Sequence, residues 1–320
     1  MGNNGLVQDL TSRKRTTTVE FQGRLGNLFF EYAAGLTVHK MRGGKLFLQD
    51  WRSPSASEFL TYLDPIGKDG LAQSFWRFRY FERRGLVDKV RWRIMRFLRR
   101  TVHRFLVSTG ILERFVQGQP FSPLPEDLSM VEKHNLMLFG HFQHPTWFEP
   151  SLDVVTEKIW AALSDHVQHL VATKATVISV RLDDYVPLGW DLLPDYYERA
   201  VDALGHIEGP IWITSDDPNA ARAMLEPILR SRDLVASPAP ELDLNPAMRD
   251  FGLWSVARNV VMSNSTFCWW GTVTGQRQGN QPPKTIICPT RWIPFGSNSE
   301  VLIRADWIRL DATFSSDLWS

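Results

Sequence analysis

The fold of this chain is indicated most clearly by residues 260–271, which read Val-Val-Met-Ser-Asn-Ser-Thr-Phe-Cys-Trp-Trp-Gly. The apolar residues at its start predict a short buried strand, and the segment after the polar turn has the character of a helix. A strand that leads through such a turn into a helix presents hydroxyl and backbone N–H groups, which suit phosphate oxygens. Ser, Asn and Thr are also the usual helix-capping residues, so an ordinary cap is the simpler interpretation of the turn alone.

Strands and helices alternate through the rest of the C-terminal half. Strands are expected at 135–142, 177–180, 211–213, 260–262 and 284–288, with a further short one at 234–235; helices are expected at 150–173, 194–204, 219–229, 246–258 and 267–274. The opening stretch, residues 19–48, has the pattern strand, glycine-rich loop, helix, strand. Such alternation predicts an α/β protein whose parallel sheets are covered on both faces.

The chain is long enough for two domains. We expect a flexible tail at residues 1–17, an N-terminal domain at 18–150 and a C-terminal domain at 151–320. The N-terminal domain is expected to carry a helical insertion at about residues 58–121, where the composition becomes basic and aromatic.

A basic amphipathic helix is predicted within this insertion, at residues 87–106. Apolar residues recur there at spacings of three and four, and arginines such as Arg93, Arg96 and Arg100 lie on or near the opposite face. The arginines form a solvated cationic face in one interpretation. In the other, the helix makes peripheral contact with an anionic membrane surface.

Composition excludes several classes of protein. With 43% hydrophobic and 22% charged residues, a full globular core is expected. A net charge of +1 argues against a dedicated nucleic-acid binder. The 2 cysteines, Cys268 and Cys288, exclude a disulfide framework and favour a reducing compartment. Since no secretory signal or membrane-spanning run stands out, we expect a cytoplasmic protein, peripheral at most to the inner face of a membrane.

Polar segments follow the expected strands at four places: residues 23–27, 181–185, 214–217 and 263–267. Ligands of parallel sheets bind beyond the carboxyl ends of the strands, so we expect these segments to lie near one another. Arg181 offers paired donors for phosphate oxygens, and the carboxylates can accept from ribose hydroxyls or guanine N–H groups. The pattern predicts a site for a nucleotide diphosphate.

Metal and cofactor sites are not indicated. The His141/His144 and His166/His169 pairs have no third ligand of matching character close in sequence. Asp-x-Asp pairs, phosphate loops of the Gly-Lys-Ser/Thr type and paired Cys-x-x-Cys motifs do not occur. We therefore expect a reaction that needs neither a metal nor a cofactor.

Three of these segments resemble the α-1,2-fucosyltransferases of glycosyltransferase family 11. Residues 23–33 read Gly-Arg-Leu-Gly-Asn-Leu-Phe-Phe-Glu-Tyr-Ala, similar to the family's Gly-Arg-Leu-Gly-Asn-Gln-Met-Phe-Gln-Tyr-Ala. Ser215-Asp216-Asp217 matches its Ser-Asp-Asp, and residues 264–271 match its Asn-Ser-Ser-Phe-Ser-Trp-Trp-Gly. The resemblance spans about residues 19–310, with the basic insertion the least similar part.

The strand-end motif at residues 179–185 resembles the family's His-Val-Arg-Arg-Gly-Asp-Tyr with departures. Ser179 replaces the family's His, Leu182 replaces its second Arg, and Asp183 replaces its Gly. One cation is lost and one carboxylate gained, which weakens attraction for a diphosphate if these side chains face it. Two alternatives therefore stay open: a non-catalytic relative that binds glycans or nucleotides, and a transferase that uses a different nucleotide sugar.

The resemblance implies a GT-B fold of two facing Rossmann-like domains and inverting transfer of L-fucose from GDP-fucose to a galactoside hydroxyl. The N-terminal domain would present the acceptor and the C-terminal domain would hold the nucleotide sugar. The implied catalytic residues are Arg181 for the diphosphate, Asn27 for the sugar or glycosidic oxygen, and Asp184 as the matching carboxylate, with Asp183 and Glu31 as other options for the base. The implied substrate-binding residues are Gly23, Arg24, Gly26, Asp216, Asp217, Asp250, Asn264, Ser265, Thr266 and Phe267.

Overall fold

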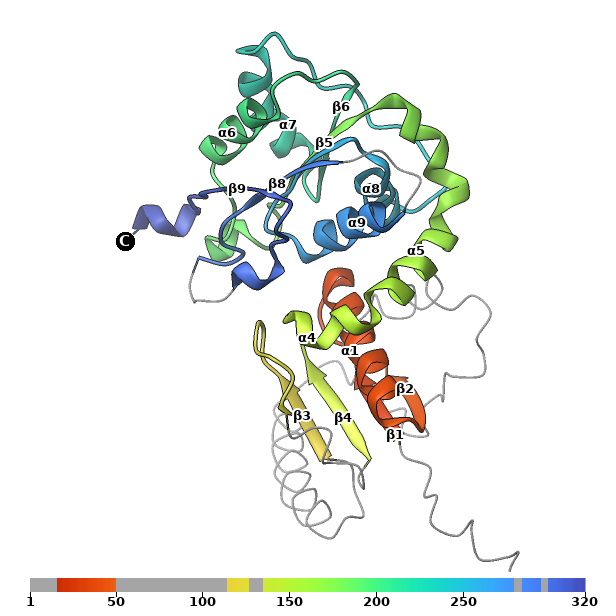
Figure 1. Cartoon of the computed structure of the whole chain (residues 1–320). Helices are drawn as coiled ribbons and strands as arrows, with labels where there is room; N and C mark the ends of the chain where they lie inside the picture. The colour runs from red at the N-terminus through yellow and green to blue at the C-terminus, as the bar shows by residue number, and fades with distance from the viewer. Residues whose placement is uncertain (1–15, 50–113, 127–134, 279–283, 295–298, 320) are drawn as a thin grey trace, which may run out of the picture. The chain divides into compact units, whose positions relative to one another are not determined.

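The computed structural model describes residues 16–49, 114–126, 135–278, 284–294 and 299–319 (Figure 1). The chain divides into two compact units, residues 1–151 and 152–320. Each unit contains one sheet whose strands all pair in parallel. The predicted α/β class with two Rossmann-like units is therefore confirmed. The predicted basic helix at 87–106 lies outside the described residues.

The N-terminal unit holds a four-stranded sheet of order β2-β1-β4-β3. Its elements are β1 Thr16–Glu20, α1 Leu25–Arg42, β2 Lys45–Gln49, β3 Arg114–Gly118, β4 Leu136–Gly140, α4 Pro145–Phe148 and a 3-10 turn at Glu149–Ser151. Helix α1 packs on β1, β2 and β4, and most of its surface is buried. Gly35 permits this close packing, because an added Cβ would lie 2.4 Å from Val19 Cγ2.

Two boundaries predicted for this unit are wrong. The helical insertion was expected to reach residue 121, but Arg114–Gly118 form strand β3, in register with Leu136–Gly140. Phe115 and Val116 favour extended backbone, and parallel pairing with the buried strand β4 holds this segment as a strand. The tail was expected to include Thr16 and Thr17, which instead begin β1. Parallel pairing with β2 supplies hydrogen bonds that their polar side chains did not suggest.

The C-terminal unit holds a five-stranded sheet of order β6-β5-β7-β8-β9. Its main elements are α5 Leu152–Val167, β5 Thr176–Val180, α6 Pro194–Leu204, β6 Ile211–Ser215, α7 Pro218–Arg230, α8 Pro246–Val256, β7 Asn259–Val261, α9 Thr266–Arg277, β8 Thr285–Pro289 and β9 Ile308–Leu310. Short 3-10 helices lie at Gln168–Thr173, Val186–Leu188, Ser299–Leu302 and Ser315–Trp319. The strand expected at 234–235 is reduced to an isolated bridge between Ile211 and Ala236.

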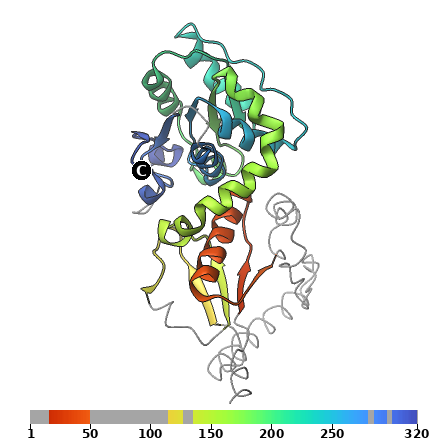
Figure 2. The ribbon, with the colours of Figure 1, turned by 45° about the vertical axis from the view of Figure 1, so that its right-hand side comes forward.

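Helices cover both faces of this sheet (Figures 1 and 2). Helices α6 and α7 pack together on one side, and α5, α8 and α9 pack together on the other. The strands alternate accordingly: Ile178 and Val180 join the core under α6 and α7, whereas Thr214 accepts a hydrogen bond of 2.9 Å from Trp254 Nε1 of α8. This arrangement buries the sheet and leaves its carboxyl edge for polar side chains.

The tryptophan pair belongs to the core. Trp269 and Trp270 are buried, with ring centroids 5.2 Å apart in an edge-to-face arrangement. Trp269 Nε1 donates to the Leu302 carbonyl at 2.7 Å. Helix α9 approaches α8 closely at Gly271, where an added Cβ would lie 2.9 Å from Trp254 Cε3. The pair therefore fixes helix α9, whose start is part of the site.

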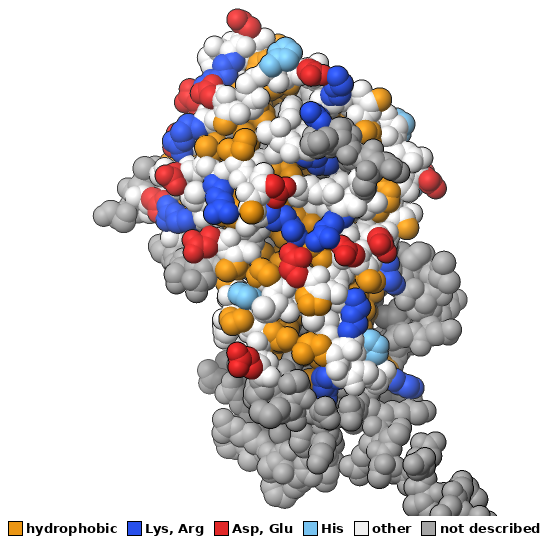
Figure 3. All heavy atoms as spheres, viewed as in Figure 1, with side chains coloured by type: hydrophobic (Ala, Val, Ile, Leu, Met, Phe, Trp, Pro, Cys, Tyr) orange, Lys and Arg blue, Asp and Glu red, His pale blue; other side chains and the backbone are white. Residues whose placement is uncertain are grey.

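The described surface carries mixed charge. Figure 3 shows Lys and Arg side chains interspersed with Asp and Glu over the visible face, rather than gathered by sign. None of the helices in the described ranges is both long and apolar enough to cross a membrane.

Candidate active site

The strand order of the C-terminal unit indicates where a ligand of this sheet would bind. From β5 the chain moves to β6 on one side, and β7, β8 and β9 then continue on the other side, so the order reverses between β5 and β7. Ligands of open parallel sheets bind at this switch point, beyond the carboxyl ends of the strands. Arg181 directly follows β5, and the Ser263–Ser265 turn follows β7. Tyr185 Oη joins the two loops by donating to the Asn264 carbonyl at 3.3 Å.

Arg181 lies at this edge between two carboxylates. Its Nη2 lies 2.7 Å from Asp184 Oδ1, and its Nε lies 3.0 Å from Asp216 Oδ2. The guanidinium also lies over the Tyr185 ring, 5.3 Å from the centroid. The side chain remains 21% exposed, so solvent or a ligand can reach it. The structure thus places the predicted phosphate-binding arginine at the switch point, held by protein partners.

The third predicted segment follows β6, next to β5 in the sheet. Asp216 Oδ1 accepts from the Leu182 main-chain N–H at 2.9 Å, in addition to the ion pair of Oδ2 with Arg181. Asp217 Oδ1 accepts from the Ala220 N–H at 3.0 Å and caps helix α7. Both carboxylates were predicted as ribose or guanine contacts. The structure gives each a defined partner within the protein.

Two departures from the family motif are buried. Leu182 is 7% exposed and packs in the core under α6 and α7, while its backbone N–H reaches Asp216. Ser179 is 3% exposed, with Oγ 3.1 Å from Ser263 Oγ. Neither side chain faces a diphosphate at the sheet edge. Of the three departures, Asp183 is the exposed one, and it alone adds charge where a ligand would arrive.

The fourth segment forms the start of helix α9. Ser265 is the N-cap, and its Oγ accepts from the Cys268 N–H at 3.4 Å. Thr266 is the first helical residue and is partly exposed. Asn264 is buried, and its Nδ2 donates to the carbonyls of Trp190 at 2.9 Å and Trp292 at 3.2 Å. Asn264 therefore fastens two loops around this turn, so its predicted role as a direct substrate contact does not follow from its position.

Phe267 and Asp250 lie close to the same helix start. The Phe267 ring packs edge-to-face on Trp254 at 5.4 Å between centroids. Asp250, in α8, accepts from Arg249 Nε at 3.1 Å and Nη2 at 2.8 Å. Burial raises the pKa of Asp250 to about 6, against the lowering effect of Arg249. Burial raises the pKa of the Cys268 thiol to about 12, with a smaller contribution from Asp250, which places that carboxyl near α9.

The N-terminal unit has a corresponding edge, with the strand order reversing between β1 and β4. Gly23 has φ 82°, a conformation that favours glycine, and Arg24 is the N-cap position of α1. Gly26 and Asn27 then lie in the first turn of this helix. Gln143, after β4, donates from Nε2 to Asn27 Oδ1 at 3.1 Å. The predicted Gly23–Asn27 segment thus forms a helix start, joined to the loop after β4.

Burial shifts the pKa values of titratable side chains in this unit. Glu31 is buried, and its Oε2 accepts from the Gln22 N–H at 3.0 Å. Burial raises the pKa of Glu31 to about 10, with a further contribution from Glu20. The raised pKa keeps Glu31 protonated at neutral pH, which disfavours its suggested role as a general base. Burial lowers the pKa of His141, which directly follows β4.

Three carboxylates form a cluster in the described part of the chain. Ligand atoms of Asp183, Asp184 and Asp216 lie within 4.8 Å of one another, a spacing that a metal ion can bridge. Two of these carboxylates already pair with Arg181. A cation would therefore compete with a fixed guanidinium at this place. That the reaction needs no metal remains a prediction. If a metal ion were required, these three carboxylates are the described residues that could bind it.

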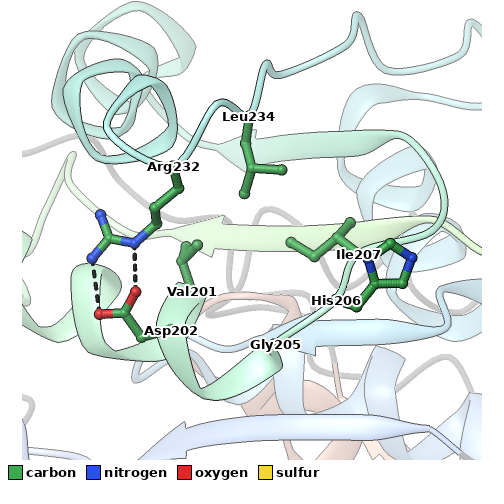
Figure 4. A pocket seen from close by; sticks show the side chains of 7 residues that line it. All are labelled: Val201, Asp202, Gly205, His206, Ile207, Arg232 and Leu234. Atoms are coloured by element: carbon green, nitrogen blue, oxygen red, sulfur yellow. Dashed lines mark hydrogen bonds and ion pairs between the residues drawn. The ribbon is translucent and has the colours of Figure 1, made fainter.

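A separate shallow pocket lies at the opposite edge of the same sheet (Figure 4). Val201 and Gly205 line it from the end of α6, and Arg232 and Leu234 from the segment after α7, together with Asp202, His206 and Ile207. The Arg232 guanidinium pairs with Asp202, from Nε and Nη2. Residues 201–207 lead into β6, and the segment after α7 bridges the first residue of β6 through Ile211 and Ala236, so this pocket lies at the amino end of β6, away from the switch point.

Two residues that contact the predicted site residues had no role assigned from the sequence. Tyr185 lies within the strand-end motif, and Gln143 lies three residues after the end of β4. Aromatic and amide side chains after a strand are common, so spacing alone did not indicate that one would lie under Arg181 and the other would bind Asn27. The strand order supplies that information.

Comparisons with known proteins give a distant relationship. No protein-family model matches the chain. The O-antigen biosynthesis glycosyltransferase WbnK of Escherichia coli is 23% identical over 312 residues, covering 90% of this chain and 98% of that protein. Among solved structures, fucosyltransferase NodZ from Bradyrhizobium matches with TM-score 0.44 and 12% identity, covering 82% of this chain and 92% of that chain. E. coli heptosyltransferase WaaC with ADP matches with TM-score 0.44 and 10% identity over 93% of each chain.

Proposed function

We propose that this chain is an inverting glycosyltransferase that moves L-fucose from GDP-fucose to a galactoside hydroxyl in α-1,2 linkage, in glycan or surface-polysaccharide synthesis. The observation that carries the proposal is the position of Arg181, directly after β5 at the switch point and joined through Tyr185 to the turn that opens α9. The similarity to an O-antigen biosynthesis glycosyltransferase supports glycosyl transfer as the reaction class. The motif resemblance at residues 23–33 and 264–271 supports GDP-fucose as the donor.

The reaction breaks the bond between the anomeric carbon of fucose and the diphosphate oxygen, while an acceptor hydroxyl oxygen attacks the opposite face. Negative charge grows on the departing diphosphate, and positive charge grows on the sugar ring. Arg181 donates hydrogen bonds to that diphosphate, which an arginine can do with two parallel N–H groups. The α9 N-terminus, with Ser265 and Thr266, adds partial positive charge and donors. This mechanism assigns the largest share of rate enhancement to leaving-group stabilisation.

The remaining roles are distributed over the two units. The C-terminal unit holds the nucleotide, with Asp250 as the proposed partner of guanine or ribose. The N-terminal unit presents the acceptor, with Asn27 orienting the sugar or its glycosidic oxygen. Asp184 is the proposed carboxylate for the acceptor proton, and the more exposed Asp183 is the alternative. Arg24 with Gly23 and Gly26 supplies the close backbone approach at the sugar.

Nucleotide-dependent thermal stability tests the donor assignment. We expect GDP and GDP-fucose to raise the melting temperature, and UDP and ADP to leave it unchanged. A ligand at 100 times its dissociation constant adds about 2.7 kcal/mol to the free energy of unfolding, which is easily measured. Arg181→Ala should lose this stabilisation. Arg230→Ala, which removes an exposed arginine paired with Glu226, is the matched control.

Acceptor-dependent release of GDP then tests catalysis. A galactoside should accelerate GDP release from GDP-fucose, and mass spectrometry should find fucose on the acceptor. Tight GDP-fucose binding without turnover on any galactoside would favour the non-catalytic binder. Stabilisation by a different nucleotide sugar alone would favour a transferase with another donor.

A further inference from the structure

Asp216 connects two strands of the sheet at the candidate site. It follows β6, yet both of its carboxylate oxygens bind groups that follow β5: Oδ1 accepts from the Leu182 N–H at 2.9 Å, and Oδ2 lies 3.0 Å from Arg181 Nε. Its side chain is 15% exposed. The Asp216 carboxylate therefore contacts both the Leu182 backbone and the Arg181 side chain. These two contacts fix the guanidinium relative to the end of β5.

We propose that Asp216 is a positioning residue that holds Arg181 for the diphosphate of the donor, rather than a ligand of the nucleoside. This inference rests on the proposed function for the identity of the anion. The orientation of Arg181 by Asp216 stands on the contacts within the protein.

The donors of Arg181 divide in a way that supports this role. A guanidinium carries five N–H groups, one on Nε and two on each Nη. Nε forms an ion pair with Asp216 Oδ2 at 3.0 Å, and Nη2 donates one N–H to Asp184 Oδ1. Nη1 has no hydrogen bond or ion pair to any residue in the described ranges. The end-on edge of Nη1 and Nη2 is thus the edge left for paired hydrogen bonds to phosphate oxygens.

Asp184 holds the same arginine differently. It lies three residues along the same loop, its side chain is 39% exposed, and it contacts Nη2, which belongs to the edge left for phosphate. Exposed ion pairs of this kind contribute little, so a diphosphate with more negative charge can replace Asp184 at Nη2. Asp216 binds Nε on the other edge and can stay in place when the nucleotide arrives.

A double-mutant cycle on GDP affinity tests whether Asp216 acts through Arg181. We expect Asp216→Ala to weaken GDP binding about tenfold in the wild-type background, a loss within the usual coupling between contacting residues. In the Arg181→Ala background the same change should leave the dissociation constant unaltered. An equal loss in both backgrounds would mean that Asp216 contacts the nucleotide itself, and would overturn the proposal. Glu226→Ala, which removes an exposed carboxylate of α7, is the control for charge.

Hydrogen exchange at Arg181 tests the positioning without nucleotide. In arginine-labelled apo protein, the Nε–H signal of Arg181, assigned by its loss in Arg181→Lys, should exchange slowly in wild type and in Asp184→Asn. It should exchange rapidly in Asp216→Ala, with the fold checked by circular dichroism. Exchange in wild type as fast as at exposed Arg230 would overturn the proposal. If wild type binds no GDP, the donor assignment fails, while this measurement still decides the role of Asp216.

Discussion

Ser179 Oγ and Ser263 Oγ lie 3.1 Å apart, and this hydrogen bond joins β5 to the turn after β7 inside the protein. Both side chains are buried, at 3% and 0% exposure. The pair spans the switch point, with Ser179 two residues before Arg181 along the chain. The α-1,2-fucosyltransferases have a histidine at the position of Ser179. In this chain the small Ser179 hydroxyl is buried there and forms a hydrogen bond with the Ser263 hydroxyl.

Replacing Ser179 by histidine should destabilise the protein. The larger ring must displace well-packed neighbours, which costs about 1–3 kcal/mol of the free energy of unfolding. Ser179→Ala, the matched control, should cost about 1 kcal/mol, because Ser263 loses its partner. Urea denaturation measures both. A histidine variant as stable as wild type would show that the position holds an imidazole without strain.

Leu182→Arg, which restores the family residue, should also reduce stability. The side chain packs in the apolar core under α6 and α7 and is 7% exposed, so an arginine there buries a charge or forces the loop to rearrange. Leu182→Met preserves volume and should cost less than about 1.5 kcal/mol. Thermal unfolding of the two variants checks this. Equal stability of the arginine variant would mean that residue 182 turns readily to the surface.

Asp250 should make the free energy of unfolding depend on pH between 3.8 and about 6. Its pKa is raised from 3.8 to about 6, so between these values the folded protein binds more protons at this carboxyl than the unfolded chain. The contribution is fully present below pH 3.8 and is lost as the pH rises through 6. Asp250→Asn should therefore gain stability relative to wild type as the pH rises from 4 to 8, as unfolding experiments across roughly that range would show. A constant difference between the two proteins would contradict the raised pKa.

Transfer activity should survive a strong chelator. Arg181 and the α9 N-terminus supply the positive charge that a metal ion would otherwise provide. The trio Asp183, Asp184 and Asp216 is already engaged with that arginine through two of its members. Turnover with EDTA, compared with added Mg²⁺ or Mn²⁺, measures this. Loss on chelation that metal restores would assign a cation to the trio.

Much of the fold follows from local patterns. The apolar run before Arg181 and the Ser263–Thr266 turn predicted strand ends because buried parallel strands are short and continuous, and both lie where expected. Strand β3 was missed, since Arg114–Gly118 is extended through pairing with β4, a partner distant in sequence. A helix was expected after the glycine-rich loop, and α1 begins at Leu25, already within the polar segment at residues 23–27.

The site was less accessible from sequence than the strands. Arg181 was identified because it follows a strand directly. The contacts of Asp216 with Leu182 and Arg181 depend on β6 lying beside β5, which no spacing reveals. Asn264 lies in a polar turn of the kind that caps helices and is usually exposed. It is nevertheless buried, and it binds the loops that carry Trp190 and Trp292. Roles that depend on long-range packing required the structure.

The most direct test of the account is the turnover of Arg181→Ala with GDP-fucose and a galactoside, beside Arg230→Ala. Removing one donor to the leaving group should lower turnover about a hundredfold or more. The fold should persist, because the side chain lies at a polar sheet edge and is 21% exposed. The account predicts a folded, nearly inactive Arg181→Ala and a fully active Arg230→Ala. Near-normal turnover by folded Arg181→Ala would contradict it.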